Sequence, residues 1–302
     1  MPFTGTARVP QVLAAFEAGA TVVLQGLHLS WTPIAAFCRE LEARLGQPAQ
    51  ANAYLTPRRS QGLPVHHDTH DVFVLQVSGS KRWLVYEPVL ELPLKHQRYT
   101  ADLGGPGEVV LDVTLGAGDT LYLPRGWLHE ALTSETDSLH VTIGVNVHTW
   151  LDALRTALDR CAGELELRRA VPDDGAGAEE ILELLRDLLA PDEVARSRRE
   201  RFLRGRRPIL DGQASQLRAL DRLTIESVVE RRPTVIADFD GETLQFEGTR
   251  ISFPPQARQE VDAIVTATEP IGLSQLPGRL DEAGRLVLAR RLVREGFLRL
   301  VD

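Results

Sequence analysis

Short strand-like segments separated by turns occupy residues 50–148, and this pattern constrains the fold more than any other feature of the chain. Apolar and β-branched residues dominate each segment, and glycine-containing stretches such as SGS, LGGPG and LGAGD lie between them. The segments are ANAYLT, DVFVLQV, KRWLVYEP, EVVLDVTL, DTLYLP and LHVTIGVNVH. Because many short strands at close spacing are typical of closed or sandwiched antiparallel sheets, we predict a β-sandwich or barrel.

Helical patterns flank this region on both sides. Residues 10–46 have the pattern of a helix, a short apolar strand and a second helix. Residues 150–232 carry leucine and alanine at helical spacing, with dense charge of both signs. Residues 233–302 combine a hairpin turning at Asp240-Gly241, two helices and a closing strand. The last of these patterns is typical of a winged helix.

Composition excludes several classes of protein. The chain has 302 residues, of which 43% are hydrophobic and 25% are charged, as in a globular protein of more than one domain. A net charge of -8 argues against binding nucleic acid through bulk charge. No run approaches the ~18 apolar residues of a membrane helix. Cys38 and Cys161 match no metal-binding spacing, and with no secretion signal in view we expect a cytoplasmic protein with reduced thiols.

Potential metal ligands are concentrated between His66 and Asp71, where three histidines and two aspartates fall within six positions. If this segment is extended, alternate side chains share a face. His66, Asp68 and His70 then lie together, and His67 faces the other way. An imidazole and a carboxylate two positions apart can bind one metal ion, and a further ligand must come from elsewhere in the chain.

The segment GDTLYLPRGWLH, residues 118–129, offers that further ligand. A Gly-Asp turn precedes a strand, Pro124 ends the strand, and Gly126 lets the chain bend so that His129 points back into a barrel. Two histidines and one carboxylate leave about three positions of an octahedral metal open, as in the facial triad of non-haem Fe(II) oxygenases. H-x-D alone is a weak signal. Its combination with P-x-G-x-x-H, the second metal motif of cupin-type jelly rolls, is far more specific.

These motifs resemble those of the JmjC/cupin-like ribosomal oxygenases, which are Fe(II)- and 2-oxoglutarate-dependent protein hydroxylases. NAYLT, HHDTHDVFVLQVSGSKRW, GDTLYLPRGWLHEA and SLHVTIGVN carry the resemblance, which spans about a third of the chain between Asn52 and Asn146. The resemblance implies Fe(II) held by His66, Asp68 and His129. It also implies 2-oxoglutarate as co-substrate and O2 as oxidant.

A co-substrate pocket follows from the same resemblance. Lys81 falls where the family places the basic residue that pairs with the distal carboxylate of 2-oxoglutarate, and a mobile ammonium suits that contact. A solvent-facing turn lysine is the alternative. Asn52 and Tyr54 match polar positions that line the pocket in the family. His140 and Thr142 share a strand face and could complete it, or could make structural hydrogen bonds.

For four further residues, the surrounding sequence predicts a role outside the metal site. The family carries a tyrosine or an aliphatic residue at the position of His70, so we expect no ligand there. Lys95, the only lysine besides Lys81, has no matching context and is expected at the surface. Trp83 and Trp127 are expected in the core or in a pocket wall.

The resulting fold prediction is α+β, with three parts in the order that the family shows. Residues 1–148 are predicted to form a JmjC/cupin jelly-roll (double-stranded β-helix) catalytic domain. Residues 149–232 form a helical dimerisation segment, and residues 233–302 form a winged-helix-like domain. Family members carry more chain before the first helix, so we expect the sequence to be shortened, or the jelly roll incomplete, at its N-terminal edge.

The functional hypothesis is a 2-oxoglutarate-dependent dioxygenase that hydroxylates a protein side chain. By resemblance, the substrate is an arginine or histidine of a ribosomal protein, and the enzyme is a homodimer. One alternative keeps the chemistry but acts on a peptide natural product or a small molecule. Another class of alternative is a non-catalytic cupin with a winged helix, acting as a regulator or adaptor. The charge balance makes direct nucleic-acid binding unexpected.

Overall fold

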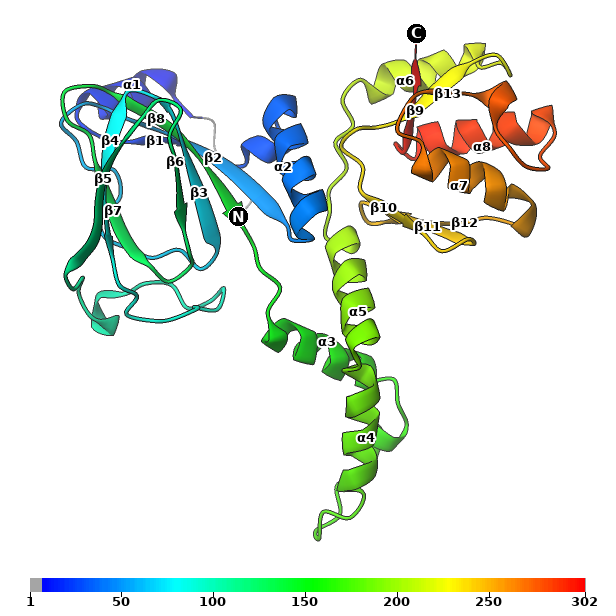
Figure 1. Cartoon of the computed structure of the whole chain (residues 1–302), viewed down its shortest axis with the longest axis horizontal. Helices are drawn as coiled ribbons and strands as arrows, with labels where there is room; N and C mark the ends of the chain where they lie inside the picture. Colours follow the sequence, from blue (N-terminus) through cyan, green and yellow to red (C-terminus); the bar gives the residue numbers. More distant parts are fainter. Residues whose placement is uncertain (1–6, 302) are drawn as a thin grey trace. The chain divides into compact units, whose positions relative to one another are not determined.

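A computed structural model describes residues 7–301, whose contacts divide into two compact units (Figure 1). The first unit comprises residues up to 42 together with 47–147, and the second comprises 43–46 together with the residues from 148 onward. Within the described range, the structure contains no helix with the length and apolarity that crossing a bilayer requires.

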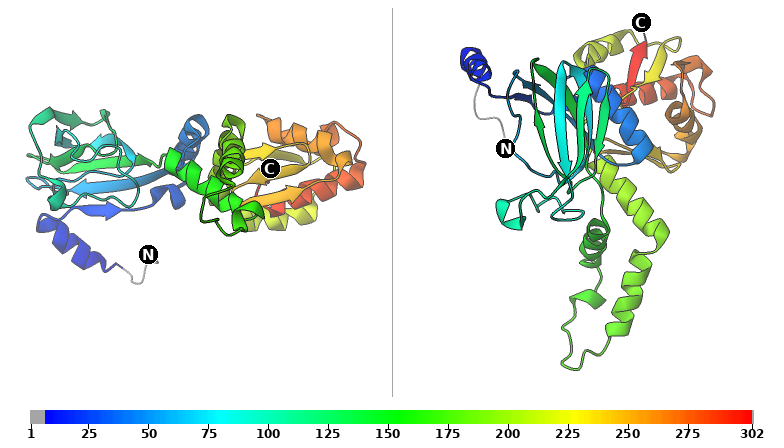
Figure 2. Two further views of the ribbon diagram at one scale, coloured as in Figure 1. Left: turned by 90° about the horizontal axis from the view of Figure 1, so that it is seen from below. Right: turned by 60° about the vertical axis from the view of Figure 1, so that its left-hand side comes forward.

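The first unit is a jelly roll of two antiparallel sheets (Figures 1 and 2). One sheet has the strand order β1-β2-β8-β3-β6 and the other has the order β5-β4-β7. Its strands are β1 (Val22–Leu24), β2 (Ala49–Thr56), β3 (Asp71–Ser78), β4 (Ser80–Tyr86), β5 (Val109–Gly116), β6 (Thr120–Leu123), β7 (Leu128–Leu132) and β8 (Ser138–Val145). The predicted jelly roll is therefore present.

Alternation along the strands separates an apolar exterior from a mixed interior. Ala51 of β2 and Ile143 of β8 face outward and pack under helix α2 (Thr32–Leu45), with Cys38 of that helix between them. Between the two sheets, Val74 of β3 packs with Trp83 of β4. Because side chains alternate, the inward positions of β2 and β8 are free to carry polar groups into the barrel. Helix α1 (Val9–Glu17) precedes β1.

The second unit begins with a helical stretch and ends in a small α+β unit with two three-stranded sheets, β10-β11-β12 and β13-β9-β14. Its helices are α3 (Trp150–Cys161), α4 (Ala178–Leu188), α5 (Pro191–Arg204), α6 (Gln213–Ala219), α7 (Arg258–Thr266) and α8 (Glu282–Arg294). Its strands are β9 (Val228–Arg231), β10 (Ala237–Phe239), β11 (Thr243–Phe246), β12 (Thr249–Ser252), β13 (Ile271–Gly272) and β14 (Leu298–Val301).

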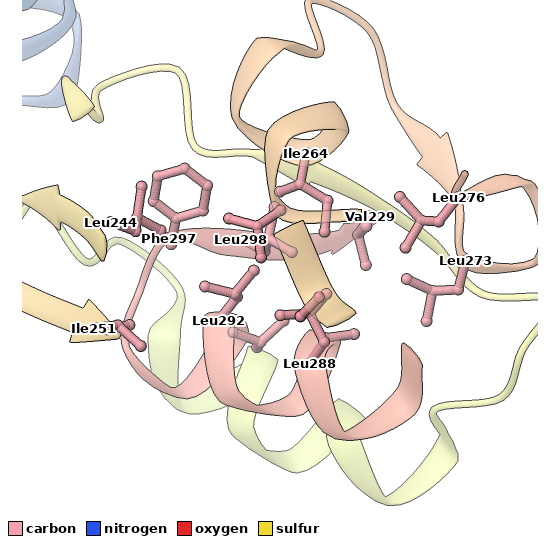
Figure 3. Packing of buried hydrophobic residues seen from close by; sticks show 14 of the residues in the cluster. Val229, Leu244, Ile251, Ile264, Leu273, Leu276, Leu288, Leu292, Phe297 and Leu298 are labelled. Atoms are coloured by element: carbon pink, nitrogen blue, oxygen red, sulfur yellow. The ribbon is translucent and has the colours of Figure 1, made fainter. Parts of the chain in front are cut away.

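A single apolar cluster joins the helices and strands of this α+β unit. Leu288 and Leu292 project from α8 toward Val229 of β9 and Leu298 of β14 (Figure 3). Leu292, Val229 and Leu298 are almost wholly buried. Each fully buried side chain of this size contributes about 1.5–3 kcal/mol, so the cluster is the core of this α+β unit.

Strand β9 corrects the helical interpretation of residues 150–232. The helix predicted through this stretch ends early, at α6, and β9 then runs through the middle of a sheet between β13 and β14. β-Branched residues such as Val228 and Val229 favour a strand, and pairing with β14, which lies far along the sequence, decides the matter. The predicted hairpin is present as β10 and β11, with Gly241 at a φ of 97° in its turn. The winged-helix and dimerisation assignments stay predictions, as do the three domain boundaries.

Candidate metal centre

Three side chains from two neighbouring segments converge at one end of the jelly roll. His66 and His129 pair through a backbone bridge, in which each amide N–H donates to the other residue's carbonyl at 3.2 and 2.9 Å. Asp68 lies just before β3, with its Oδ2 3.8 Å from Nε2 of His129. One ligand atom from each of these residues lies within 4.8 Å of the others. This triangle has the size and the donor atoms of a metal site.

Backbone carbonyls orient both imidazoles. Nδ1 of His66 lies 2.7 Å from the carbonyl oxygen of Pro64, and Nδ1 of His129 lies 3.0 Å from that of Trp127. A carbonyl oxygen can only accept a hydrogen bond, so each Nδ1 carries a proton, and in a neutral ring the lone pair is then on Nε2. Burial, followed by the nearby His66, lowers the pKa of His129 to about 4. His129 is therefore neutral at pH 7, which is the form that binds metals.

The H-x-D segment is not part of the strand that follows it. β3 begins at Asp71, and His66 joins the sheet only through its bridge to His129. The turn before β7 requires a glycine at position 126. Gly126 has a φ of 91°, and a Cβ at that position would lie 2.7 Å from the carbonyl oxygen of Leu90. The glycine amide also donates to the carbonyl of Asp68 at 3.0 Å, which links the two ligand-bearing segments.

His70, which would share a face with His66 and Asp68 in an extended segment, is not one of the three residues of the candidate metal centre. Its Nε2 is 3.3 Å from Nε2 of Gln50, and its ring packs against Gly144, where a Cβ would lie 2.3 Å from the ring. His67 turns the other way and is buried, with Nε2 3.1 Å from the carbonyl oxygen of Gln97. Strand parity alone therefore cannot choose among the histidines.

The three side chains of the candidate metal centre also line an inner cavity between the two sheets. Lys81 lines the same cavity, is only 3% exposed, and donates from Nζ to the hydroxyl of Thr56 at 2.9 Å. Burial lowers the pKa of Lys81 to about 8. Within the described part of the chain, no carboxylate pairs with this ammonium. A buried cation of this kind is costly unless a ligand brings an anion.

Aromatic rings form a wall of the inner cavity. Tyr54 and His140 sit opposite each other on β2 and β8, and their rings stack at 4.9 Å with 2° between the planes. Trp83 meets His140 edge-on at 5.4 Å. Burial, and secondarily the charge of Lys81, lower the pKa of His140 to about 3, so this imidazole is neutral and its buried Nδ1 has no partner in the described residues. Thr142 completes this side of the cavity.

Asn52 has a different position from the one expected. It is not among the residues that line the inner cavity, and its Oδ1 accepts a hydrogen bond from the amide of Gly26 at 3.0 Å. The lining residues missed from the sequence include Thr21, Gly62, Leu63 and Glu130. Gly62 borders the lysine closely, because a Cβ there would lie 2.9 Å from Nζ of Lys81. No spacing in the sequence links Gly62 to Lys81, and only the tertiary structure brings them together.

A second, outer cavity is open to solvent and also borders the candidate metal centre. His66 and Asp68 line both cavities, so these two side chains mark the junction between them. Lys95, which we expected at the surface, is exposed and lines the outer cavity. The arrangement can therefore hold one small molecule in the inner cavity while a second molecule approaches from the outer one.

Comparison with known proteins shows what part of the chain resembles. The model of the JmjC domain family matches residues 28–153. The bifunctional lysine-specific demethylase and histidyl-hydroxylase NO66 of Drosophila persimilis is 37% identical over 142 residues, which are 46% of this chain and 20% of that protein. Ribosomal oxygenase 1 of Gallus gallus is 35% identical over 174 residues, which are 54% of this chain and 28% of that protein.

A solved structure of similar fold covers more of the chain. The Escherichia coli ribosomal oxygenase YcfD superposes with a TM-score of 0.62 at 20% identity, over 93% of this chain and 78% of that one. This likeness concerns the fold. The chain spans 20% and 28% of the length of the two curated relatives named above. Residues 28–153 therefore match the JmjC domain family, and the chain is a homologue of the NO66 protein and of ribosomal oxygenase 1 over 142 and 174 residues, respectively.

Proposed function

We propose that the chain is an Fe(II)- and 2-oxoglutarate-dependent oxygenase that hydroxylates an arginine or histidine side chain of a ribosomal protein. Its relatives are named histidyl-hydroxylases and ribosomal oxygenases, and one YcfD structure is described as a complex with cobalt and 2-oxoglutarate. The observation that carries the proposal is internal to the chain. Two histidines, one aspartate and a buried lysine without a carboxylate partner line one cavity.

His66, Asp68 and His129 would hold the iron. Their donor set fits Fe(II), because it combines two imidazole lone pairs with one carboxylate and leaves the remaining positions open. Bound iron would supply the activation of O2 that attack on an unreactive C–H bond needs, coupled to the decarboxylation of 2-oxoglutarate to succinate. The carbonyls of Pro64 and Trp127 hold both imidazoles in the tautomer and orientation that a metal ligand requires.

Lys81 would bind the distal carboxylate of 2-oxoglutarate. Its ammonium lies in the inner cavity with a hydroxyl as partner, and a carboxylate would supply the missing counter-charge. Tyr54, His140 and Trp83 pack around the same space, and with a ligand bound they would help to exclude water from it. The outer cavity would admit the side chain to be hydroxylated, so that the two organic substrates reach the metal centre from different sides.

Assembly and location belong to the same proposal. Helices α3 and α4 expose the apolar side chains Trp150, Leu158 and Leu182, and burying them against a second copy would form a homodimer. The α+β unit around α7 and α8 would be a winged-helix-like domain that does not bind nucleic acid directly, given the net charge of -8. Two free thiols, Cys38 and Cys161, fit a cytoplasmic location.

The test follows succinate production. Protein purified without oxygen is incubated with Fe(II), 2-oxoglutarate and O2, with and without ribosomes, beside an Asp68→Ala control. We expect ribosome-stimulated succinate formation and a 16 Da increase on one ribosomal protein. Turnover no higher than that of Asp68→Ala under both conditions would refute the oxygenase. Turnover that ribosomes do not stimulate would point to a small-molecule or peptide substrate instead.

A further inference from the structure

The wall of the outer cavity carries positive charge. Lys95 and Arg98 line it together with His67 and His70. Among the described residues that line this cavity, Asp68 is the one acidic side chain, and Asp68 belongs to the candidate metal centre. The part of the cavity that lies away from the metal centre is therefore cationic.

These two cations have no partner of their own. Lys95 and Arg98 are exposed, and neither makes an ion pair or a side-chain hydrogen bond within residues 7–301. Two other arginines of the jelly roll, by contrast, are paired. Arg59 is paired with Glu135 at 2.6 Å, and Arg82 is paired with Asp112. Lys95 and Arg98 thus keep their full charge available to a molecule that enters the outer cavity.

The loop that carries the cations is fixed to the metal-binding segment. His67, which lies between the two ligands His66 and Asp68, contacts the carbonyl oxygen of Gln97 through Nε2 at 3.1 Å. Tyr99 meets the ring of His67 edge-on at 5.8 Å, and its hydroxyl donates to the carbonyl of Gly104 at 3.0 Å. The side chain of Gln97 in turn accepts from the amide of Leu94 at 2.8 Å. The backbone that bears Lys95 and Arg98 is therefore held at a set position beside the metal centre.

We propose that the outer cavity binds a protein segment with an acidic side chain next to the residue presented to the metal centre. Lys95 and Arg98 pair with that carboxylate and thereby fix which residue enters. This proposal rests on the proposed function for its meaning, but the binding itself can be measured without turnover. A peptide is favoured over a nucleic acid because two cations on a chain of net charge -8 are too few to hold a phosphate backbone.

The experiment compares two fluorescein-labelled nine-residue peptides that differ only beside a central histidine. One has aspartate on both sides and the other has lysine, and fluorescence anisotropy measures their binding to the full chain. We expect the aspartate peptide to bind about tenfold more tightly at low ionic strength, with the preference shrinking as salt is added. Equal affinities would overturn the proposal.

Two variants locate the effect. Charge reversal by Lys95→Glu with Arg98→Glu should invert the preference, and the neutral Lys95→Met with Arg98→Met should abolish it. The matched control is Arg218→Glu with Arg222→Glu, which changes the net charge by the same amount at exposed positions of the second unit. The control should behave like the parent protein. An unchanged preference in the cavity variants, or tighter binding of a nine-nucleotide single-stranded RNA than of the aspartate peptide, would refute the assignment.

Failure of this proposal is distinguishable from failure of the proposed function. A preference for the aspartate peptide without succinate formation would support peptide binding in the outer cavity and refute the proposed oxygenase activity. Succinate formation without any preference would do the reverse.

Discussion

The inner and outer cavities share His66 and Asp68, and a lysine lines each of them. The two lysines differ in their exposure to solvent. In the inner cavity, Lys81 is buried and contacts one hydroxyl. In the outer cavity, Lys95 and Arg98 are exposed and are carried by a loop tied to His67. A buried charge interacts strongly at a set position, whereas an exposed charge is screened and interacts weakly.

This difference suits two kinds of ligand. A buried ammonium in the inner cavity would select a small molecule that brings its own carboxylate to a fixed place. Two exposed cations in the outer cavity would select more loosely among chain segments of a larger partner. If this comparison is right, substitutions in one cavity should leave the ligand of the other almost unaffected.

The largest effect is expected from removing a ligand of the candidate metal centre. His129→Ala should weaken Co(II) or Mn(II) binding by more than about 100-fold, since losing only the outer partners of metal ligands costs about 10–100-fold. His70→Ala is the matched control, because His70 lies nearby and outside the cluster. Metal titration followed by absorption or electron paramagnetic resonance measures both. Equal loss of metal in the two variants would contradict the three-residue site.

The next effect concerns the inner cavity alone. Lys81→Met should raise the KM for 2-oxoglutarate by about 100-fold, because a buried charge-assisted contact is worth roughly 2–5 kcal/mol. Metal affinity and binding of the protein substrate should stay within about twofold of the parent values. Steady-state kinetics and a parallel metal titration test this separation. An unchanged KM would show that the distal carboxylate is held elsewhere.

Lys81 should also make stability depend on pH. Its pKa is about 8 in the folded chain and 10.5 in the unfolded chain, so between these values the unfolded chain holds a proton that the folded chain has released. The free energy of unfolding of the ligand-free protein should therefore rise with pH through this window, by on the order of 3 kcal/mol.

The measurement is urea unfolding at pH 7 and pH 10. The stability difference between the parent and Lys81→Met should change by that amount between the two pH values, while 2-oxoglutarate binding to the parent weakens above about pH 8. A difference that is independent of pH would mean that the ammonium is compensated by a group near it.

The smallest effects on KM are expected from substituting two glycines, one beside each cavity. A Cβ at Gly62 would lie 2.9 Å from Nζ of Lys81, and a Cβ at Gly144 would lie 2.3 Å from the ring of His70. Gly62→Ala should raise the KM for 2-oxoglutarate by about threefold to tenfold, and Gly144→Ala should do the same for the protein substrate. Gly105→Ala, with no atom within 4 Å of the added carbon, is the control. Crossed effects would contradict the separation of the cavities.

Much of this molecule was predictable because its signals are local. The short strands with turns predicted the jelly roll, and H-x-D with P-x-G-x-x-H nominated His66, Asp68 and His129, which the fold brings together. The misassigned element, β9, was misread because its partner β14 lies about seventy residues away in the sequence. Pairing between distant strands leaves no local trace, and propensity is a weak guide when tertiary contacts compete with it.

The sequence by itself determined the alternation of the strands, the turn at Gly126 and the types of residue offered to a metal. These features depend on backbone geometry and on neighbours a few positions apart. Only the tertiary structure decided that His70 faces Gln50, that Asn52 bonds to Gly26, and that Lys95 and Arg98 border a cavity. The physical reason is that burial and charge pairing depend on which distant segments meet, and those contacts exist only once the two sheets have closed.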